Sequence, residues 1–124
     1  MEFKERRPIY AQIADYIREG ILQGHWSEED RIPSIREMAV ETEVNPNTVT
    51  RTYNLLQEQG IIYNKRGIGY FIAENADSAT KKIMREDFIK NELPYFFRKL
   101  EILSIDLGEL SELFDGNRSK ETEK

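Results

Sequence analysis

The chain has 124 residues, 39% of them hydrophobic, and a formal net charge of −5. This length is enough for one small domain with an appendage, and the absence of cysteine excludes disulfides, thiolate zinc sites and cysteine catalysis. No apolar run approaches the ~20 residues of a membrane-spanning helix, and the polar start MEFKERRP does not resemble a signal peptide. We therefore expect a cytoplasmic protein without a membrane partner.

The first predicted element is a helix that begins at Pro8 and ends near Gly24. Its isoleucines recur every four residues, which is the spacing of one buried helix face: Ile9, Ile13, Ile17 and Ile21. We expect this helix to be scaffold. The lone His25 follows it and has no partner residues for catalysis or metal binding, so neither a catalytic residue, a metal site nor a cofactor is expected.

Residues 30–51 predict two short helices joined by a tight turn. Ser34 can cap the first helix, and Glu37 three residues later completes a capping box. Asn45 can cap the second helix, with Pro46 at the first helical position, where its missing N–H costs nothing.

The second of these helices has two different faces. At ~100° per residue, Val49, Tyr53 and Leu56 share one side. The opposite side holds polar residues: Asn47, Thr50, Arg51 and Asn54. Asn and Thr are poor helix formers, so their presence favours a recognition helix for the DNA major groove over an ordinary solvated face, which is the alternative.

A β-hairpin is predicted after Gly60, which ends the helix. Strand-like runs at Ile61–Asn64 and Tyr70–Ala73 flank Lys65-Arg66-Gly67-Ile68-Gly69, whose glycines supply the positive φ angles of a hairpin loop. A helix-turn-helix followed by a hairpin with a basic tip is typical of a winged helix. The two glycines do not form a nucleotide-binding motif, because they lie between two strands.

Residues 8–73 resemble the N-terminal domain of GntR-type bacterial transcription regulators. The matching residues are Pro8-Ile9-Tyr10-x-Gln12-Ile13, Gly24, Arg31-Ile32-Pro33-Ser34-x-Arg36-Glu37-Met38-Ala39, Val44-Asn45-Pro46-Asn47-Thr48-Val49, Tyr53-x-x-Leu56, Gly60 and Gly67-x-Gly69-x-Phe71. Asn45-Pro46-Asn47-Thr48 and the short tail are similar to the YtrA-like subgroup. The resemblance implies a repressor of its own operon, often one that encodes an ABC transporter.

The same resemblance indicates which residues should contact DNA. The family's DNA-contacting arginine is replaced here by Pro46, so Asn47, Thr50 and Arg51 carry more of the base recognition. Residues 1–72 hold 9 Lys and Arg against 11 Asp and Glu, but Arg36, Arg51, Lys65 and Arg66 lie on the elements that would meet DNA. The expected DNA-binding residues are Ser34, Arg36, Asn45, Asn47, Thr48, Thr50, Arg51, Asn54, Lys65, Arg66, Gly67 and Gly69.

The C-terminal third predicts two helices. We expect a DNA-binding domain at residues 1–75, a helical dimerisation segment at 76–116 and a disordered tail at 117–124. The first helix runs from Asp77 or Ser78 to about Glu101 with a kink at Pro94. The second begins with a cap at Ser104-Ile105-Asp106 and runs to about Phe114, where Asp115-Gly116 stops it. A continuous coiled-coil seam from Ile89 to Phe114 is the alternative to this hairpin.

These helices have more large apolar residues than a two-helix hairpin can bury by itself. We expect the surplus to form the interface of a homodimer: Phe88, Phe96, Phe97, Leu100, Leu103, Leu107, Leu110 and Phe114. Two helices do not enclose the ~300 Å³ of a usual small-molecule site, so an effector ligand is not expected.

The expected fold is mostly α with a small β-hairpin: an N-terminal winged helix-turn-helix followed by a two-helix C-terminal dimerisation segment. The expected function is transcription regulation by a homodimer on a palindromic double-stranded operator, and not enzymatic catalysis. A winged helix that serves protein–protein contact is the alternative, favoured only by the acidic net charge.

Overall fold

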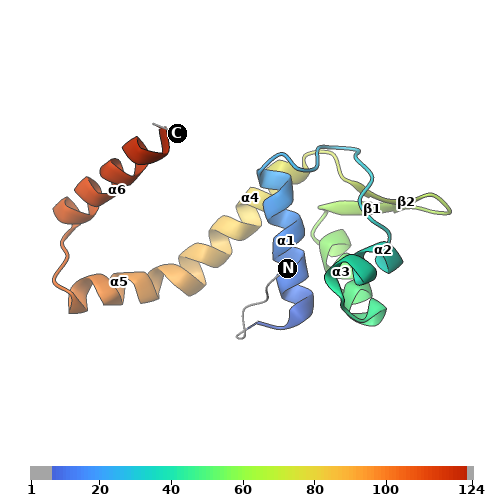
Figure 1. The fold of residues 1–124 in the computed structure, drawn as a ribbon, viewed down its shortest axis with the longest axis horizontal. Coiled ribbons are helices and arrows are strands. Elements are labelled where there is room, and N and C mark those ends of the chain that lie inside the picture. Colours follow the sequence, from blue (N-terminus) through green and yellow to red (C-terminus); the bar gives the residue numbers. More distant parts are fainter. Residues whose placement is uncertain (1–6, 123–124) are drawn as a thin grey trace. The chain divides into compact units, whose positions relative to one another are not determined.

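The computed structural model of the chain describes residues 7–122, and its α-helices and β-strands are labelled in Figure 1. They are α1 (Ile9–Leu22), α2 (Ile35–Thr42), α3 (Pro46–Glu58), β1 (Ile62–Lys65), β2 (Gly69–Ile72), α4 (Ala76–Asp87), a π-helical turn η1 (Phe88–Glu92), α5 (Leu93–Ile102) and α6 (Leu107–Thr122). The fold is therefore mostly helical with one antiparallel hairpin, as expected. Within residues 7–122, no helix has the length and apolar character needed to cross a membrane.

The chain divides into two compact units, one up to residue 84 and one from residue 85 onward. We call the first unit the winged domain. Its core forms where α1 and α2 pack on α3 and the hairpin closes over them. The side chains with no exposed surface include Ile13, Ile17, Met38, Val49, Tyr53 and Leu56. Burial of each such side chain contributes about 1.5–3 kcal/mol to folding, so this unit can stabilise itself.

The first turns of α4 also belong to the winged domain. Ala76 and Thr80 are fully buried, and Ile83 packs against the core. This unit therefore extends beyond residue 75, where we expected it to end.

The caps predicted for α2 and α3 are both present. The Ser34 hydroxyl accepts a hydrogen bond from the Glu37 amide at 3.1 Å, and the Ser34 amide donates to the Glu37 carboxylate at 3.0 Å. The Asn45 side chain accepts from the Asn47 amide at 2.8 Å, and Pro46 is the first residue of α3. These local bonds satisfy amide groups that a helix N-terminus otherwise leaves without partners.

The wing is held along both edges of β2. On one side β1 pairs with it, from Ile62 opposite Ile72 to Lys65 opposite Gly69. On the other side residues 29–32 add backbone bonds, including Ile32 N–H to Tyr70 O at 3.0 Å and Ile72 N–H to Asp30 O at 2.9 Å. This second pairing was not predicted. The loop itself needs glycine, since Gly67 and Gly69 have φ angles of +80° and +146°.

The expected interruption near Pro94 takes the form of the π-helical turn η1. Leu93 N–H donates to Phe88 O, which lies five residues back instead of four. Proline has no N–H and its ring collides with the carbonyl four residues earlier, so widening the preceding turn accommodates it.

The role expected for Ser104 was wrong. Ser104 has a left-handed φ of +58° and ends α5, with its amide bonded to Glu101 O and the Ile105 amide bonded to Leu100 O. The cap of α6 is Asp106, whose side chain accepts from the Glu109 amide at 2.8 Å. The break between α5 and α6 excludes the continuous coiled-coil seam.

The expected stop at Asp115-Gly116 was also wrong, because α6 continues through it to Thr122. Residues 117–122 of the expected disordered tail are therefore helical, and residues 123–124 lie outside the described residues. One glycine costs a helix only about 1 kcal/mol relative to alanine, and the Arg, Lys and Glu that follow are good helix formers.

Candidate nucleic-acid interface

The outer face of α3 presents polar side chains. Asn47, Arg51 and Asn54 are exposed, while Thr50 is half-buried and donates its hydroxyl hydrogen to Pro46 O at 3.0 Å. The opposite face is buried and includes Val49. The structure thus brings these four predicted residues together on one surface, and Thr48 lies half-buried beside them.

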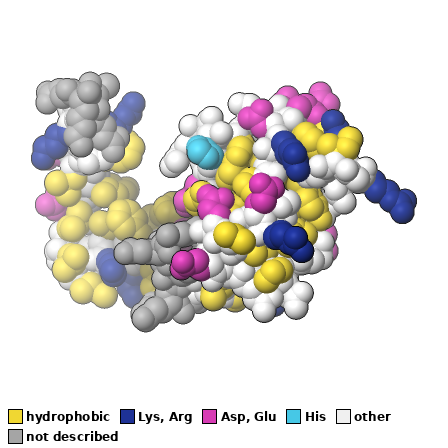
Figure 2. Space-filling model, turned by 45° about the vertical axis from the view of Figure 1, so that its right-hand side comes forward, with side chains coloured by type: hydrophobic (Ala, Val, Ile, Leu, Met, Phe, Trp, Pro, Cys, Tyr) yellow, Lys and Arg dark blue, Asp and Glu magenta, His cyan; other side chains and the backbone are white. Residues whose placement is uncertain are grey.

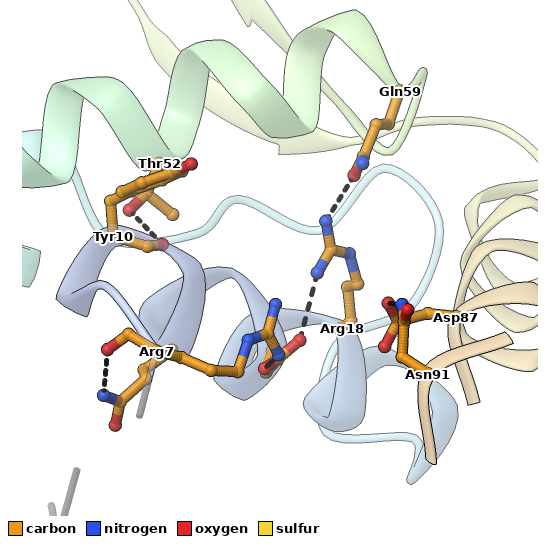
Figure 3. A network of polar contacts seen from close by, with 9 residues as sticks. Arg7, Tyr10, Arg18, Thr52, Gln59, Asp87 and Asn91 are labelled. Carbon is orange, nitrogen blue, oxygen red and sulfur yellow. Dashed lines mark hydrogen bonds and ion pairs between the residues drawn. The ribbon is translucent and has the colours of Figure 1, made fainter. Parts of the chain in front are cut away.

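Two hydrogen bonds from the inner face hold α3 in place. The buried Thr52 hydroxyl donates to Tyr10 O of α1 at 2.8 Å (Figure 3). The Tyr53 hydroxyl donates to Pro33 O at 2.5 Å, and burial raises the pKa of Tyr53 above its ordinary value. The polar face of α3 is therefore presented on a rigid support.

The far end of α3 is tied to α1 by a second set of contacts (Figure 3). Arg18 of α1, only 5% exposed, donates to the side chain of Gln59, the C-cap of α3, at 2.6 Å. Asp15 forms ion pairs with Arg18, at 3.1 Å, and with Arg7. A buried arginine needs such partners, and here they join the two helices.

Arg51 makes a contact that sequence reasoning missed. Its guanidinium lies 3.8 Å from the centre of the Tyr10 ring, which belongs to α1. Both residues line a hollow on the outer face of α3, together with Asn47, Thr50, Asn54, Leu55 and Glu58. No local pattern links positions 10 and 51, so only the packed structure could reveal this pair.

The N-terminus of α2 holds the next two predicted residues. Ser34 is half-buried and its hydroxyl is engaged in the capping box, while Arg36 is exposed and forms no ion pair within residues 7–122. The hydrogen bonds from Ser34 lower the pKa of Glu37, so this carboxylate keeps its charge at the helix N-terminus.

The wing carries the remaining predicted cations. Lys65 and Arg66 are exposed, and the Lys65 ammonium lies 4.5 Å from the centre of the Phe71 ring. A Cβ atom added to Gly69 would lie 3.0 Å from Nε of Arg31, which places a further exposed arginine at the base of the wing. Sequence reasoning missed Arg31, because its position follows from the unpredicted pairing of residues 29–32 with β2.

On the face that Figure 2 draws, Lys and Arg side chains are separated by acidic and uncharged ones. Because residues 1–72 hold 9 Lys and Arg against 11 Asp and Glu, we expect few simultaneous phosphate contacts and a modest dependence of affinity on salt.

The C-terminal helices α5 and α6 expose their apolar side chains, which appear as yellow surface in Figure 2. Neither helix has a buried residue among those described. Of the residues predicted for the dimer interface, Leu100 and Leu110 are half-buried, and the rest are exposed: Phe88, Phe96, Phe97, Leu103, Leu107 and Phe114. The structure adds Tyr95 and Ile102, which the sequence analysis did not include.

Within residues 7–122, no group of three or more His, Asp or Glu side chains could hold a metal ion. The ionisable residues around α3 instead offer hydrogen-bond donors and acceptors to an outside partner.

Comparison with known proteins assigns this chain to a family. Residues 9–72 match the family model described as bacterial regulatory proteins, gntR family. Two relatives from Bacillus subtilis (strain 168) cover most of the chain. The transcriptional regulator YhcF is 36% identical, with 90% of each chain covered. The transcriptional repressor YtrA is 35% identical, with 85% of this chain and 80% of YtrA covered.

Solved structures agree with this assignment. A putative transcriptional regulator of the GntR family from Bacteroides thetaiotaomicron is 45% identical, with a TM-score of 0.76 over 92% of this chain and 99% of that one. The DNA-binding domain of AraR, solved in complex with its operator ORR3, is 29% identical. Its TM-score is 0.54, over 59% of this chain and 88% of that chain.

Proposed function

Because this chain belongs to the gntR family of bacterial regulatory proteins, and is therefore a DNA-binding transcriptional regulator and not an enzyme, we propose that it binds a palindromic operator as a homodimer. One observation carries the proposal most directly. The chain exposes a polar face on α3, supported from behind by a complete core, and exposes apolar faces on α5 and α6. The first surface suits base edges, and the second suits another copy of the chain.

In the proposed complex, α3 lies in the major groove. Asn47 and Arg51 contact base edges, with Thr50 and Asn54 beside them, because amide and guanidinium groups can form paired hydrogen bonds with adenine and guanine. Asn45 and Thr48, at the N-terminus of α3, lie close to the backbone, where helix amides also attract phosphate. The related AraR DNA-binding domain was solved in complex with an operator, which supports DNA binding by this domain.

The other elements position the domain on the DNA backbone. Ser34 and Arg36 at the start of α2 contact phosphate, and the wing lies along the minor groove or the backbone. Its contacts come from Lys65, Arg66, Gly67 and Gly69. Such contacts set orientation and affinity but carry little sequence information.

The proposed dimer interface consists of the apolar residues of the C-terminal helices. Leu107 is 77% exposed and Phe97 is 49% exposed in the single chain, an arrangement that costs free energy unless a partner covers them. A twofold dimer covers both copies with the same surface and places two α3 helices on the two halves of a palindrome.

We further propose that the protein acts in the cytoplasm as a repressor of its own operon and of an ABC transporter. The similarity to the transcriptional repressor YtrA supports the repressor role. The protein should then bind the DNA upstream of its own gene more tightly than it binds other genomic fragments. If no fragment is retained and a protein partner is captured instead, the winged domain serves protein–protein contact.

A gel-shift experiment with total genomic fragments tests the proposal. Asn47→Ala should lower affinity for the retained fragment by ~1–3 kcal/mol and leave random DNA almost unaffected. Lys65→Ala should weaken binding to both kinds of DNA and flatten the salt dependence. Asn117→Ala in α6 is the matched control and should change neither affinity. Equal losses on both DNAs for Asn47→Ala would remove this residue from base recognition.

A further inference from the structure

We infer that Tyr10 of α1 is a positioning residue for DNA recognition, because its ring lies against the Arg51 guanidinium at the edge of the outer face of α3. This inference rests on the proposed role of Arg51 in the major groove. It adds a determinant outside the helix-turn-helix and the wing.

The geometry is that of a stacked cation and aromatic ring. The central carbon of the guanidinium lies 3.8 Å from the Tyr10 ring centre, which is van der Waals distance. An aromatic ring accepts no conventional hydrogen bond, so the N–H groups of the guanidinium that do not face the ring stay able to donate. These are the donors that a guanine base edge accepts.

The nature of the partner matters. Arg51 forms no ion pair within residues 7–122, where the salt bridges are those of Asp15 with Arg7 and Arg18. A carboxylate partner would neutralise the guanidinium and compete with the DNA for its donors. The Tyr10 ring restricts the side chain without neutralising it, so the charge and the hydrogen bonds stay available.

Tyr10, which contacts Arg51, is itself held in place. Tyr10 is half-buried in the first turn of α1, and its carbonyl accepts the hydrogen bond of 2.8 Å from the buried Thr52 hydroxyl. Thr52 follows Arg51 directly in α3, so the hydrogen bond from Thr52 and the cation–π contact of Arg51 both join this part of α3 to Tyr10. Tyr10 and Arg51 line the hollow that Asn47 and Asn54 also line.

The test uses the full chain with Tyr10→Leu, which removes the aromatic face but keeps apolar bulk, and Tyr10→Phe, which keeps the ring. Both variants retain the backbone carbonyl that Thr52 contacts. We expect Tyr10→Leu to weaken binding to the retained genomic fragment about 3- to 30-fold. Binding to a random duplex of equal length should change less than about twofold. Tyr10→Phe should behave like the unaltered chain.

Two further measurements separate positioning from a general loss of structure. In an Arg51→Ala background, Tyr10→Leu should have almost no additional effect on fragment binding, because the two residues act as one unit. In the free protein, nuclear magnetic resonance should show slowed rotation and ring-shifted signals of the Arg51 guanidinium, lost in Tyr10→Leu and kept in Tyr10→Phe.

Equal weakening on both DNAs, or an undiminished effect of Tyr10→Leu without Arg51, would overturn the inference. If Arg51→Ala lowers fragment affinity but Tyr10→Leu does not, the positioning role fails and the proposed function stands. If Arg51→Ala itself changes nothing, the proposed base contact fails, and the inference fails with it.

Discussion

In the winged domain one face of α1 and one face of α3 carry fully buried apolar side chains, whereas the large apolar side chains of α5 and α6 are exposed or half-buried. The winged domain has a complete core, with Ile13, Val49 and Leu56 fully buried. The C-terminal helices α5 and α6 have no buried residue among those described. The first unit has a core of its own, and the exposed apolar side chains of the second are the reason for proposing that another copy covers them.

The largest effect should come from a charge inside the winged domain. Val49→Asp places a carboxylate where no partner is available, which should cost roughly 3–5 kcal/mol and unfold most of the domain. Val40→Asp is the matched control, since Val40 is 75% exposed, and it should change stability by less than about 0.5 kcal/mol. Thermal unfolding followed by circular dichroism compares the two. A folded, DNA-competent Val49→Asp protein would mean that α3 faces the other way.

A charge on the C-terminal helices should act on association and not on folding. Leu107→Glu should weaken the dimer at least tenfold while the winged domain unfolds at an unchanged temperature. Ser119→Glu adds the same charge at another exposed position of α6 and serves as the control. Sedimentation equilibrium gives both dissociation constants. A dimer of unaltered strength in Leu107→Glu would remove this surface from the interface.

Two glycine-to-alanine substitutions sharpen the comparison, because they should have opposite signs. At Gly69 the φ of +146° and the nearby Arg31 side chain penalise a Cβ, so Gly69→Ala should destabilise the winged domain by about 1–2 kcal/mol. Gly116 lies within α6 with open space around it, so Gly116→Ala should stabilise this helix by up to about 1 kcal/mol. Denaturant titrations measure both changes. Destabilisation by Gly116→Ala would mean that another surface packs there.

The smallest expected effect concerns pH. Hydrogen bonds from Ser34 lower the pKa of Glu37 below its ordinary 4.5 in the folded chain. The contribution of this carboxylate is therefore complete above the unfolded pKa and is lost as the pH falls through the lower folded value. Glu37→Gln should remove this part of the pH dependence of the unfolding free energy below about pH 4.5. Val40→Asp, a change at an exposed position, should leave it in place. An identical acid unfolding profile with and without Glu37 would exclude the effect.

The parts of the fold that depend on neighbouring residues were predictable. The capping box of Ser34 and Glu37 and the start of α3 at Asn45-Pro46 form within a few residues, and both were confirmed. The end of α5 was not predictable, because Ser104 fits a helix cap as readily as the left-handed position that it occupies. The course of α6 through Gly116 depends on a balance of small propensities, which one glycine does not decide.

The candidate site also has a part that could be predicted from the sequence and a part that could not. The outer face of α3 could be derived from periodicity, since a buried Val49 and an exposed Asn47 follow from the same helix. Tyr10 beneath Arg51 and Arg31 beneath Gly69 could not, because these pairs join distant segments that only packing brings together. The DNA-contact and dimer roles of the individual residues stay predictions.

The division of work between the two regions is tested most directly by comparing the full chain with a chain that ends at Met84, where the winged domain ends. Sedimentation velocity, with and without the labelled genomic fragment, follows association and DNA binding in one measurement. The full chain should be a dimer that binds as one unit. The shortened chain should be a folded monomer with roughly 10²- to 10⁴-fold weaker fragment binding, because its second half-site is no longer tethered. A shortened chain that dimerises, or that binds the fragment as tightly as the full chain, would contradict the account.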